Sequence, residues 1–188
     1  MITIICLLLL LLFFLPAHAE KDPIDRLRKG NLNFLRHSDD GLRKDLAANG
    51  QHPYAVVVCC SDSRVVPELI FNAIPGDLFV IRVAGNVLDD HQLGSIQYAV
   101  EHLGTELVVM LGHTHCGAIG AALAGHGEGY VESIIDEIIE AVGTVKDPDE
   151  AARLNVIYGV KRIREALPGA DVRGAVYDIE SGEVSWME

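Results

Sequence analysis

The chain has 188 residues, of which 49% are hydrophobic, and its 27 acidic residues outnumber its 15 basic residues to give a formal net charge of −12. This balance argues against a nucleic-acid partner, because neutralising phosphates requires a basic face. The length suits a single domain with a substantial core.

The first nineteen residues have the pattern of an export signal. Residues 4–15 are almost wholly apolar, and Ala17-His18-Ala19 supplies an A-x-A cleavage pattern, although no Lys or Arg precedes the apolar run. The run is short for a membrane-spanning helix. We therefore predict a signal peptide over residues 1–19 and an exported protein, periplasmic or extracellular, with no membrane contact after cleavage. Without cleavage, the same segment would anchor the protein to the membrane.

Residues 20–50 are predicted to form an N-terminal helical arm. Asp22 followed by Pro23 is typical of a helix start, with an N-cap and then a proline at the first helical position. A second short helix is expected over residues 42–48. Apolar positions form only a narrow stripe on these helices, which favours packing on the domain surface or on a partner subunit.

Residues 51–188 alternate short apolar runs with helix-forming segments, which predicts one α/β domain. Near-continuous apolar strands separated by helices indicate a mostly parallel sheet of four strands that is flanked by helices. A Ser-Gly turn near the end predicts a hairpin, so the last strand should be an antiparallel edge strand. Strands are expected at residues 55–60, 79–83, 107–112, 174–178 and 184–187, and helices at about 67–72, 93–103, 117–124, 131–142 and 149–167.

Three soft metal ligands stand at the ends of two of these strands. Cys60 ends the first predicted strand, and His113 and Cys116 follow the third. Ligands of open parallel sheets bind beyond the carboxyl ends of the strands, so the three side chains converge there if the two strands are neighbours. Two thiols and an imidazole are a zinc set, and three protein ligands leave a fourth position for water. His115 is an alternative to His113, but the His-x-x-Cys spacing favours His113.

Three cysteines remain after removal of the predicted signal, and an odd number makes a poor disulfide framework. Metal ligation accounts for Cys60 and Cys116. Cys59 is expected to be a small buried residue, because adjacent strand residues face opposite sides of a sheet.

Asp62 and Arg64 follow Cys60 closely enough to act at the same centre. The Asp62 carboxylate can take the fourth coordination position or accept a proton from bound water, and Arg64 can hold that carboxylate through a bidentate pair. Such a pair would keep Asp62 ionised and oriented. The alternative interpretation is a helix cap with an ordinary ion pair.

Three segments together resemble the signature motifs of the β-class carbonic anhydrases. They are Cys60-Ser-Asp-Ser-Arg64, Arg82-Val-Ala-Gly-Asn86 and Gly112-His-x-x-Cys-Gly117. The resemblance implies one zinc ion per subunit, held by Cys60, His113 and Cys116, and a catalytic dyad of Asp62 and Arg64.

The resemblance also implies a carbon dioxide pocket and a homodimer or dimer of dimers. In the family, a glutamine at the position of Gln51 reaches in from the partner subunit, and an N-terminal helix embraces the second subunit. Phe79 and Tyr98 are implied pocket residues for which plain core packing is an equal alternative. The full implied pocket is Gln51, Phe79, Ala84 and Tyr98, with Gly117 near the metal.

The implied reaction is the reversible hydration of carbon dioxide to bicarbonate and a proton, by attack of zinc-bound hydroxide assisted by the Asp–Arg dyad. Relatives that hydrolyse carbon disulfide or carbonyl sulfide share the metal set, so that activity is an alternative. A non-catalytic zinc protein, closed by Asp62 as a fourth ligand, is another. A nucleotide-binding module is disfavoured, because no glycine-rich phosphate loop follows any predicted strand. With Trp186 as its one tryptophan, the chain is expected to lack the family's second, regulatory bicarbonate site.

Overall fold

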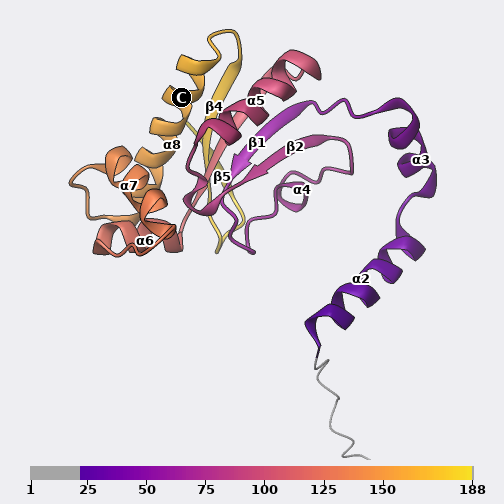
Figure 1. Cartoon of the computed structure of the whole chain (residues 1–188), viewed down its shortest axis with the longest axis horizontal. Coiled ribbons are helices and arrows are strands. Elements are labelled where there is room, and N and C mark those ends of the chain that lie inside the picture. The colour runs from indigo at the N-terminus through magenta and orange to yellow at the C-terminus, as the bar shows by residue number, and fades with distance from the viewer. Residues whose placement is uncertain (1–21, 188) are drawn as a thin grey trace, which may run out of the picture. The chain divides into compact units, whose positions relative to one another are not determined.

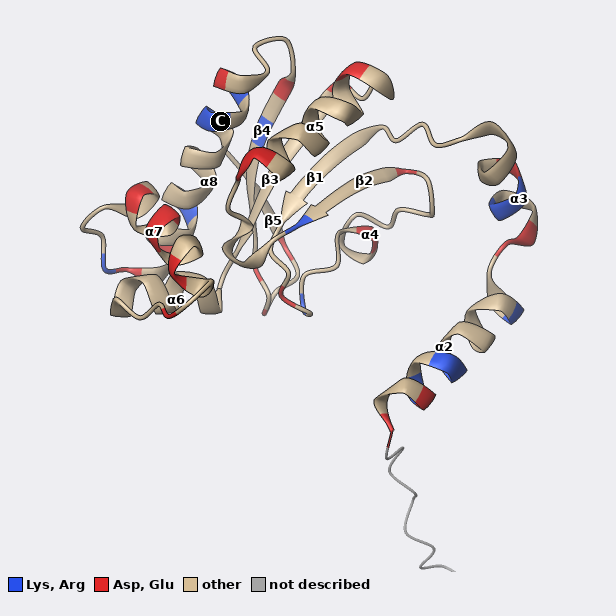
Figure 2. Cartoon of the chain, in the orientation of Figure 1, with Lys and Arg blue, Asp and Glu red and all other residues tan. Residues whose placement is uncertain are grey.

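The computed structural model describes residues 22–187 and divides into a unit ending at Asp45 and a unit beginning at Leu46 (Figure 1). The predicted signal peptide lies outside the described residues. In the first unit, helix α2 (Pro23–His37) begins behind Asp22, whose carboxylate accepts a hydrogen bond from the Ile24 N–H at 3.0 Å, as the cap pattern predicted. This helix buries no residue, and its charged side chains are mostly basic (Figure 2). Helix α3 (Asp40–Asn49) follows and crosses the division between the units.

The second unit contains a five-stranded sheet in the order β2-β1-β3-β4-β5. The first four strands in this order are parallel, and β5 pairs antiparallel with β4, so the predicted α/β fold with an antiparallel edge strand is confirmed. The neighbours β1 and β3 are the two strands that precede the candidate metal ligands. The strand bounds are β1 (Ala55–Cys59), β2 (Leu78–Arg82), β3 (Leu107–His113), β4 (Asp171–Tyr177) and β5 (Val184–Trp186).

Apolar clusters cover both faces of the sheet and its carboxyl edge. Helices α5 (Asp90–His102) and α8 (Pro148–Ala166) pack on the face that includes Val56 and Val58. The short helix α4 (Pro67–Ile70) lies on the opposite face, where Cys59 is fully buried as predicted. The third cluster joins Val83 and Val87, on either side of the 3₁₀ turn η1 (Ala84–Asn86), with α6 (Gly117–Ala124), α7 (Val131–Val142) and the start of α8. Cys60 and Cys116 belong to this third cluster, so the metal ligands sit in apolar surroundings.

The starts of two elements lie three residues before the predicted positions, because polar residues form the first turn of one and the first pair of the other. Helix α5 begins at Asp90 rather than 93, since Asp89 and Gln92 form a reciprocal capping box ahead of the first apolar residue. Strand β4 begins at Asp171 rather than 174. Its exposed face opens with an Asp171–Arg173 ion pair of 2.6 Å, which hides the buried Val172 between them from a search for apolar runs.

Helix α8 approaches the sheet closely because glycines leave room for it. A Cβ placed on Gly112 of β3 would stand 2.5 Å from Cγ2 of Val156, and one on Gly174 of β4 would stand 2.9 Å from Cγ1 of the same valine. Valine is restricted in χ1 and cannot simply rotate away. The close approach brings the polar residue Asn155, described below, deep into the unit.

A methyl group at Gly112 should destabilise the fold. We expect Gly112→Ala to lower the free energy of unfolding by about 1–3 kcal/mol, because the added methyl overpacks a filled core. Urea unfolding of metal-free protein measures this loss. The control is Gly94→Ala on the exposed side of α5, where a Cβ meets nothing within 4 Å; it should be neutral or stabilising. Equal stability of Gly112→Ala and wild type would contradict the close packing.

Candidate metal centre

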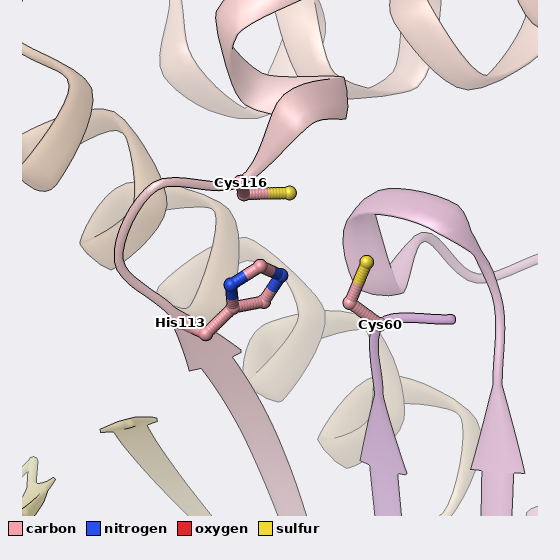
Figure 3. Close-up of side chains that lie close together, drawn as sticks. All are labelled: Cys60, His113 and Cys116. Atoms are coloured by element: carbon pink, nitrogen blue, oxygen red, sulfur yellow. The ribbon is translucent and has the colours of Figure 1, made fainter. Parts of the chain in front are cut away.

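Cys60, His113 and Cys116 converge at the carboxyl edge of the sheet (Figure 3). Cys60 directly follows β1, His113 is the last residue of β3, and Cys116 is the N-cap residue of α6. Their ligand atoms all lie within 4.8 Å of one another, and the residues are only 5%, 1% and 8% exposed. Within residues 22–187 this is the one such group, and it contains neither His115 nor a carboxylate.

The His113 ring is oriented to offer a lone pair to a metal. Its Nδ1 stands 2.8 Å from the carbonyl oxygen of Thr114; since a carbonyl only accepts, Nδ1 carries the proton. The other ring nitrogen, Nε2, is buried and has no hydrogen-bond partner in the described part of the chain. Leaving such an atom unpaired is costly unless a ligand takes it, so the ring is built to bind a cation.

The two thiols also favour a cation. The pKa of Cys60 is lowered, first because the Cys116 thiol donates a hydrogen bond to its sulfur, and further because the Gly85 N–H donates to the same sulfur at 3.2 Å. The pKa of Cys116 is raised, first by its hydrogen bond to the Cys60 sulfur and then by burial, so Cys116 keeps the proton of the pair. A divalent cation would displace the remaining proton.

The separations fit zinc. Ligand atoms on a tetrahedral zinc with bonds of about 2.3 Å to sulfur and 2.0 Å to nitrogen stand roughly 3.5–3.8 Å apart. Atoms within 4.8 Å of one another reach that arrangement through small side-chain adjustments. Three protein ligands leave a fourth position open, as in catalytic rather than structural zinc sites.

Asp62 is locked by Arg64 beside this group. The guanidinium donates through Nε to Oδ1 at 3.0 Å and through Nη2 to Oδ2 at 2.7 Å, and the backbone N–H of Arg64 adds a bond of 2.9 Å to Oδ1. Arg64 also donates to the His115 carbonyl at 3.1 Å, which ties the pair to the loop between the other two ligands. These bonds hold the pKa of Asp62 well below its usual range, with the Arg64 side chain as the largest cause. Asp62 is therefore an ionised, fixed carboxylate.

Arg82 holds the backbone of the Cys60 loop, a role that we did not predict. From the end of β2 it donates through Nε to the Cys60 carbonyl at 3.1 Å and through Nη2 to the Asp62 carbonyl at 2.7 Å. It is the register partner of Cys59. The sequence does show a charged residue, Arg82, at the end of a predicted strand. It does not show that the side chain of this residue contacts carbonyl groups.

The implied pocket residues fall into two groups. Gly117 adjoins Cys116, and Ala84 adjoins Gly85, whose N–H contacts the Cys60 sulfur, so both lie beside the metal ligands. The other three residues lie elsewhere in the subunit, and their pocket role stays a prediction; they are Gln51, Phe79 and Tyr98.

These three are placed toward the amino ends of the strands. Phe79 is level with Val56, four residues before Cys60, which is about 13 Å along a strand. Gln51 precedes β1 and is exposed. The Tyr98 ring, on α5, lies 6.3 Å from the Phe79 ring and is 48% exposed. Within one subunit, these three residues therefore lie toward the end of the sheet opposite to the cysteine sulfur atoms.

The carbonic anhydrase family model matches residues 55–184, which contain the sheet and all three candidate ligands. The chain belongs to the β-class carbonic anhydrase family. This membership confirms the predicted resemblance, and the Cys-His-Cys group fits the zinc site of the family.

Individual relatives agree with the family match. The chain is 43% identical over 127 residues to carbonic anhydrase 2 of Mycobacterium tuberculosis, covering 62% of this chain and 61% of that protein. It is 36% identical over 189 residues to a carbonic anhydrase of Pseudomonas aeruginosa, covering 82% of this chain and 84% of the relative. A solved structure of tetrameric β-carbonic anhydrases from Sordaria macrospora aligns with a TM-score of 0.73 at 29% identity, over 86% of this chain and 94% of that one.

Removing the imidazole should empty the metal centre. We expect His113→Ala to lose stoichiometric zinc, because two thiols alone do not complete the tripod. Metal analysis of the purified protein measures this directly. The matched control is His115→Ala, two residues away, whose side chain is exposed and outside the ligand group; it should retain zinc. Loss of zinc from the His115 variant with retention in the His113 variant would reverse the assignment.

Proposed function

We propose that this chain catalyses the reversible hydration of carbon dioxide to bicarbonate and a proton, with one zinc ion per subunit. The observation that carries the proposal is an open three-ligand centre with an ionised carboxylate locked beside it. Family membership gives the reaction class. The chain spans 61% of the length of the Mycobacterium tuberculosis relative, so the activity of the whole protein is inferred from the shared region.

Asp62, Arg64 and the apolar residues around the metal ligands would have different roles in this reaction. A bound zinc ion supplies a water whose pKa is lowered toward 7, and hence a nucleophile at neutral pH. Asp62 presents carboxylate oxygens that can accept a hydrogen bond from the attacking water and so fix its direction. Arg64 keeps Asp62 ionised and fixes its orientation. The apolar cluster around Cys60 and Cys116 provides a dry environment suited to a small apolar substrate.

We propose that the working form is a homodimer or a dimer of dimers. Gln51 and Tyr98 are exposed and lie away from their own subunit's metal ligands, which suits a contribution to the site of a second subunit. Helix α2 has an exposed apolar side that a second subunit can cover. The Sordaria macrospora relatives are tetrameric.

We further propose that the protein is exported and that the first nineteen residues are removed. The apolar run followed by Ala17-His18-Ala19 supports this. Among residues 22–187, no helix has both the length and the apolar character needed to cross a bilayer. If the signal is retained, the protein is held at the membrane by that segment.

One preparation tests the function, the oligomer and the export. Stopped-flow carbon dioxide hydration is measured on the exported chain, before and after chelation, alongside its zinc content, mass and sedimentation. We expect about one zinc per chain, activity that is lost with the metal and returns with it, a chain beginning near Glu20, and a dimer or tetramer.

The same experiment separates the alternatives. Carbon disulfide and carbonyl sulfide are assayed in parallel, and turnover of these substrates without carbon dioxide hydration would replace the proposed reaction. Full zinc occupancy with no turnover of any of the three would indicate a non-catalytic zinc protein. A monomer with full activity would exclude a pocket shared between subunits.

Asp62→Asn should separate metal binding from catalysis. The amide cannot serve as the charged acceptor, so we expect kcat to fall about 100-fold or more while zinc content stays unchanged. The matched control is Asp171→Asn, because Asp171 forms the same bidentate pair with the arginine two residues later, at 2.6 and 3.2 Å, at the opposite end of the sheet. The control should keep wild-type kcat. Equal kcat values for Asp62→Asn and wild type would remove Asp62 from the mechanism.

A further inference from the structure

The hydrogen bond from the Gly85 N–H to the Cys60 sulfur depends on an unusual local backbone. Gly85 lies in η1 at φ +67°, a left-handed conformation that favours glycine. A Cβ at this position would stand 2.7 Å from Cδ1 of Ile138 and 3.1 Å from Cβ of Ala118. The Gly85 backbone therefore packs closely against Ala118 of α6 and Ile138 of α7, while its N–H contacts a metal ligand.

Asn155 holds the other side of Gly85. From α8, its side-chain Nδ2 donates to the Gly85 carbonyl oxygen at 2.8 Å, and the residue is 3% exposed. The neighbouring buried positions of this helix are apolar, namely Ala151, Ala152, Val156 and Val160. Burying an amide among apolar residues is costly unless it is hydrogen-bonded, so the position carries a polar group for the sake of this bond.

The far end of the same loop is fixed by an ion pair between two helices. Glu137 of α7 accepts the Leu88 N–H at 2.8 Å, and Arg162 of α8 donates to the Leu88 carbonyl at 2.5 Å. Glu137 and Arg162 are joined at 2.6 Å. Residues 85–88 are thus held at one end by Asn155 of α8, which contacts Gly85, and at the other by Glu137 and Arg162, which contact Leu88.

We propose that Asn155 is a positioning residue for the metal centre. By holding the Gly85 carbonyl, Asn155 restrains the backbone of η1 around Gly85, and this restraint favours the orientation in which the Gly85 N–H donates to the Cys60 sulfur. A hydrogen bond to a metal-ligating thiolate orients the sulfur and tunes the charge that it donates. Asn155 therefore acts on metal retention from a neighbouring helix without touching the metal. This inference rests on the proposed zinc function.

Zinc release and cobalt spectroscopy test the proposal. Asn155→Leu keeps the branched shape of the side chain but removes the donor, and Asn155→Ser shortens the side chain so that it cannot reach Gly85. We expect both variants to release zinc to a chromophoric chelator about 10-fold faster than wild type, in line with the loss of a residue that supports a ligand. In the cobalt(II)-substituted protein, the thiolate charge-transfer band should shift.

The control for a merely structural effect is Val160→Ala on the same helix. Like Asn155→Ser, this substitution removes two heavy atoms from a buried side chain, since Val160 is only 9% exposed. The valine side chain forms no hydrogen bond, so none is lost. It should lower the thermal midpoint while leaving zinc release and the cobalt band at their wild-type values. Circular dichroism reports folding, and if Asn155→Leu does not fold, Asn155→Ser decides alone.

Two results would overturn the proposal. One is wild-type zinc release and an unshifted cobalt band in the folded Asn155 variants. The other is an equal change in Val160→Ala, because the effect would then follow stability rather than the Gly85 bond. Failure of the proposed function would be seen separately. If the wild-type protein binds zinc but does not hydrate carbon dioxide, the proposed reaction is wrong, while zinc release from the wild type and the Asn155 variants can still be compared.

Discussion

Parallel pairing of β1 with β3 is the constraint on which the metal centre depends. The register places Cys59 level with Leu111, so that Cys60 leaves the sheet beside His113. Because parallel strands end at the same edge, a thiol and an imidazole that are 53 positions apart in the chain meet there without any local signal joining them. The tight turn from β3 into α6 then brings Cys116 to the same point.

Hydrogen bonds that involve backbone groups hold two of the metal ligands, Cys60 and His113. Arg82 fixes the carbonyl of Cys60, Gly85 contacts its sulfur, and the Thr114 carbonyl fixes the His113 ring. Thr114 is itself held, because its hydroxyl oxygen accepts the Ile179 N–H at 3.1 Å. Segments that are far apart in the sequence therefore support the metal centre: the end of β2, η1, and the residues that follow β3 and β4. The geometry of the site depends on all of them being folded.

The sequence predicted the sheet and the three ligands because both leave local signals. Apolar runs predict β1 and β3, and the spacing of His113 and Cys116 predicts a chelating turn. The roles of Arg82 and Asn155 could not be read from the sequence, because these roles consist of contacts with carbonyl groups that only the tertiary fold brings close. The start of α5 was misplaced for a related reason: its first turn is polar and is specified by a capping box rather than by apolar periodicity.

The adjacent cysteines at the end of β1 have a consequence for folding fidelity. All five residues of β1 are buried, so its composition scarcely distinguishes the correct pairing from a slip of one position. Such a slip would deliver Cys59 to the metal in place of Cys60, and zinc would accept either thiol. In the native alignment Arg82 donates to the Cys60 carbonyl and Gly85 donates to the Cys60 sulfur. These two hydrogen bonds therefore favour the native register of β1 over the slipped one, whereas zinc binding alone does not distinguish the two registers.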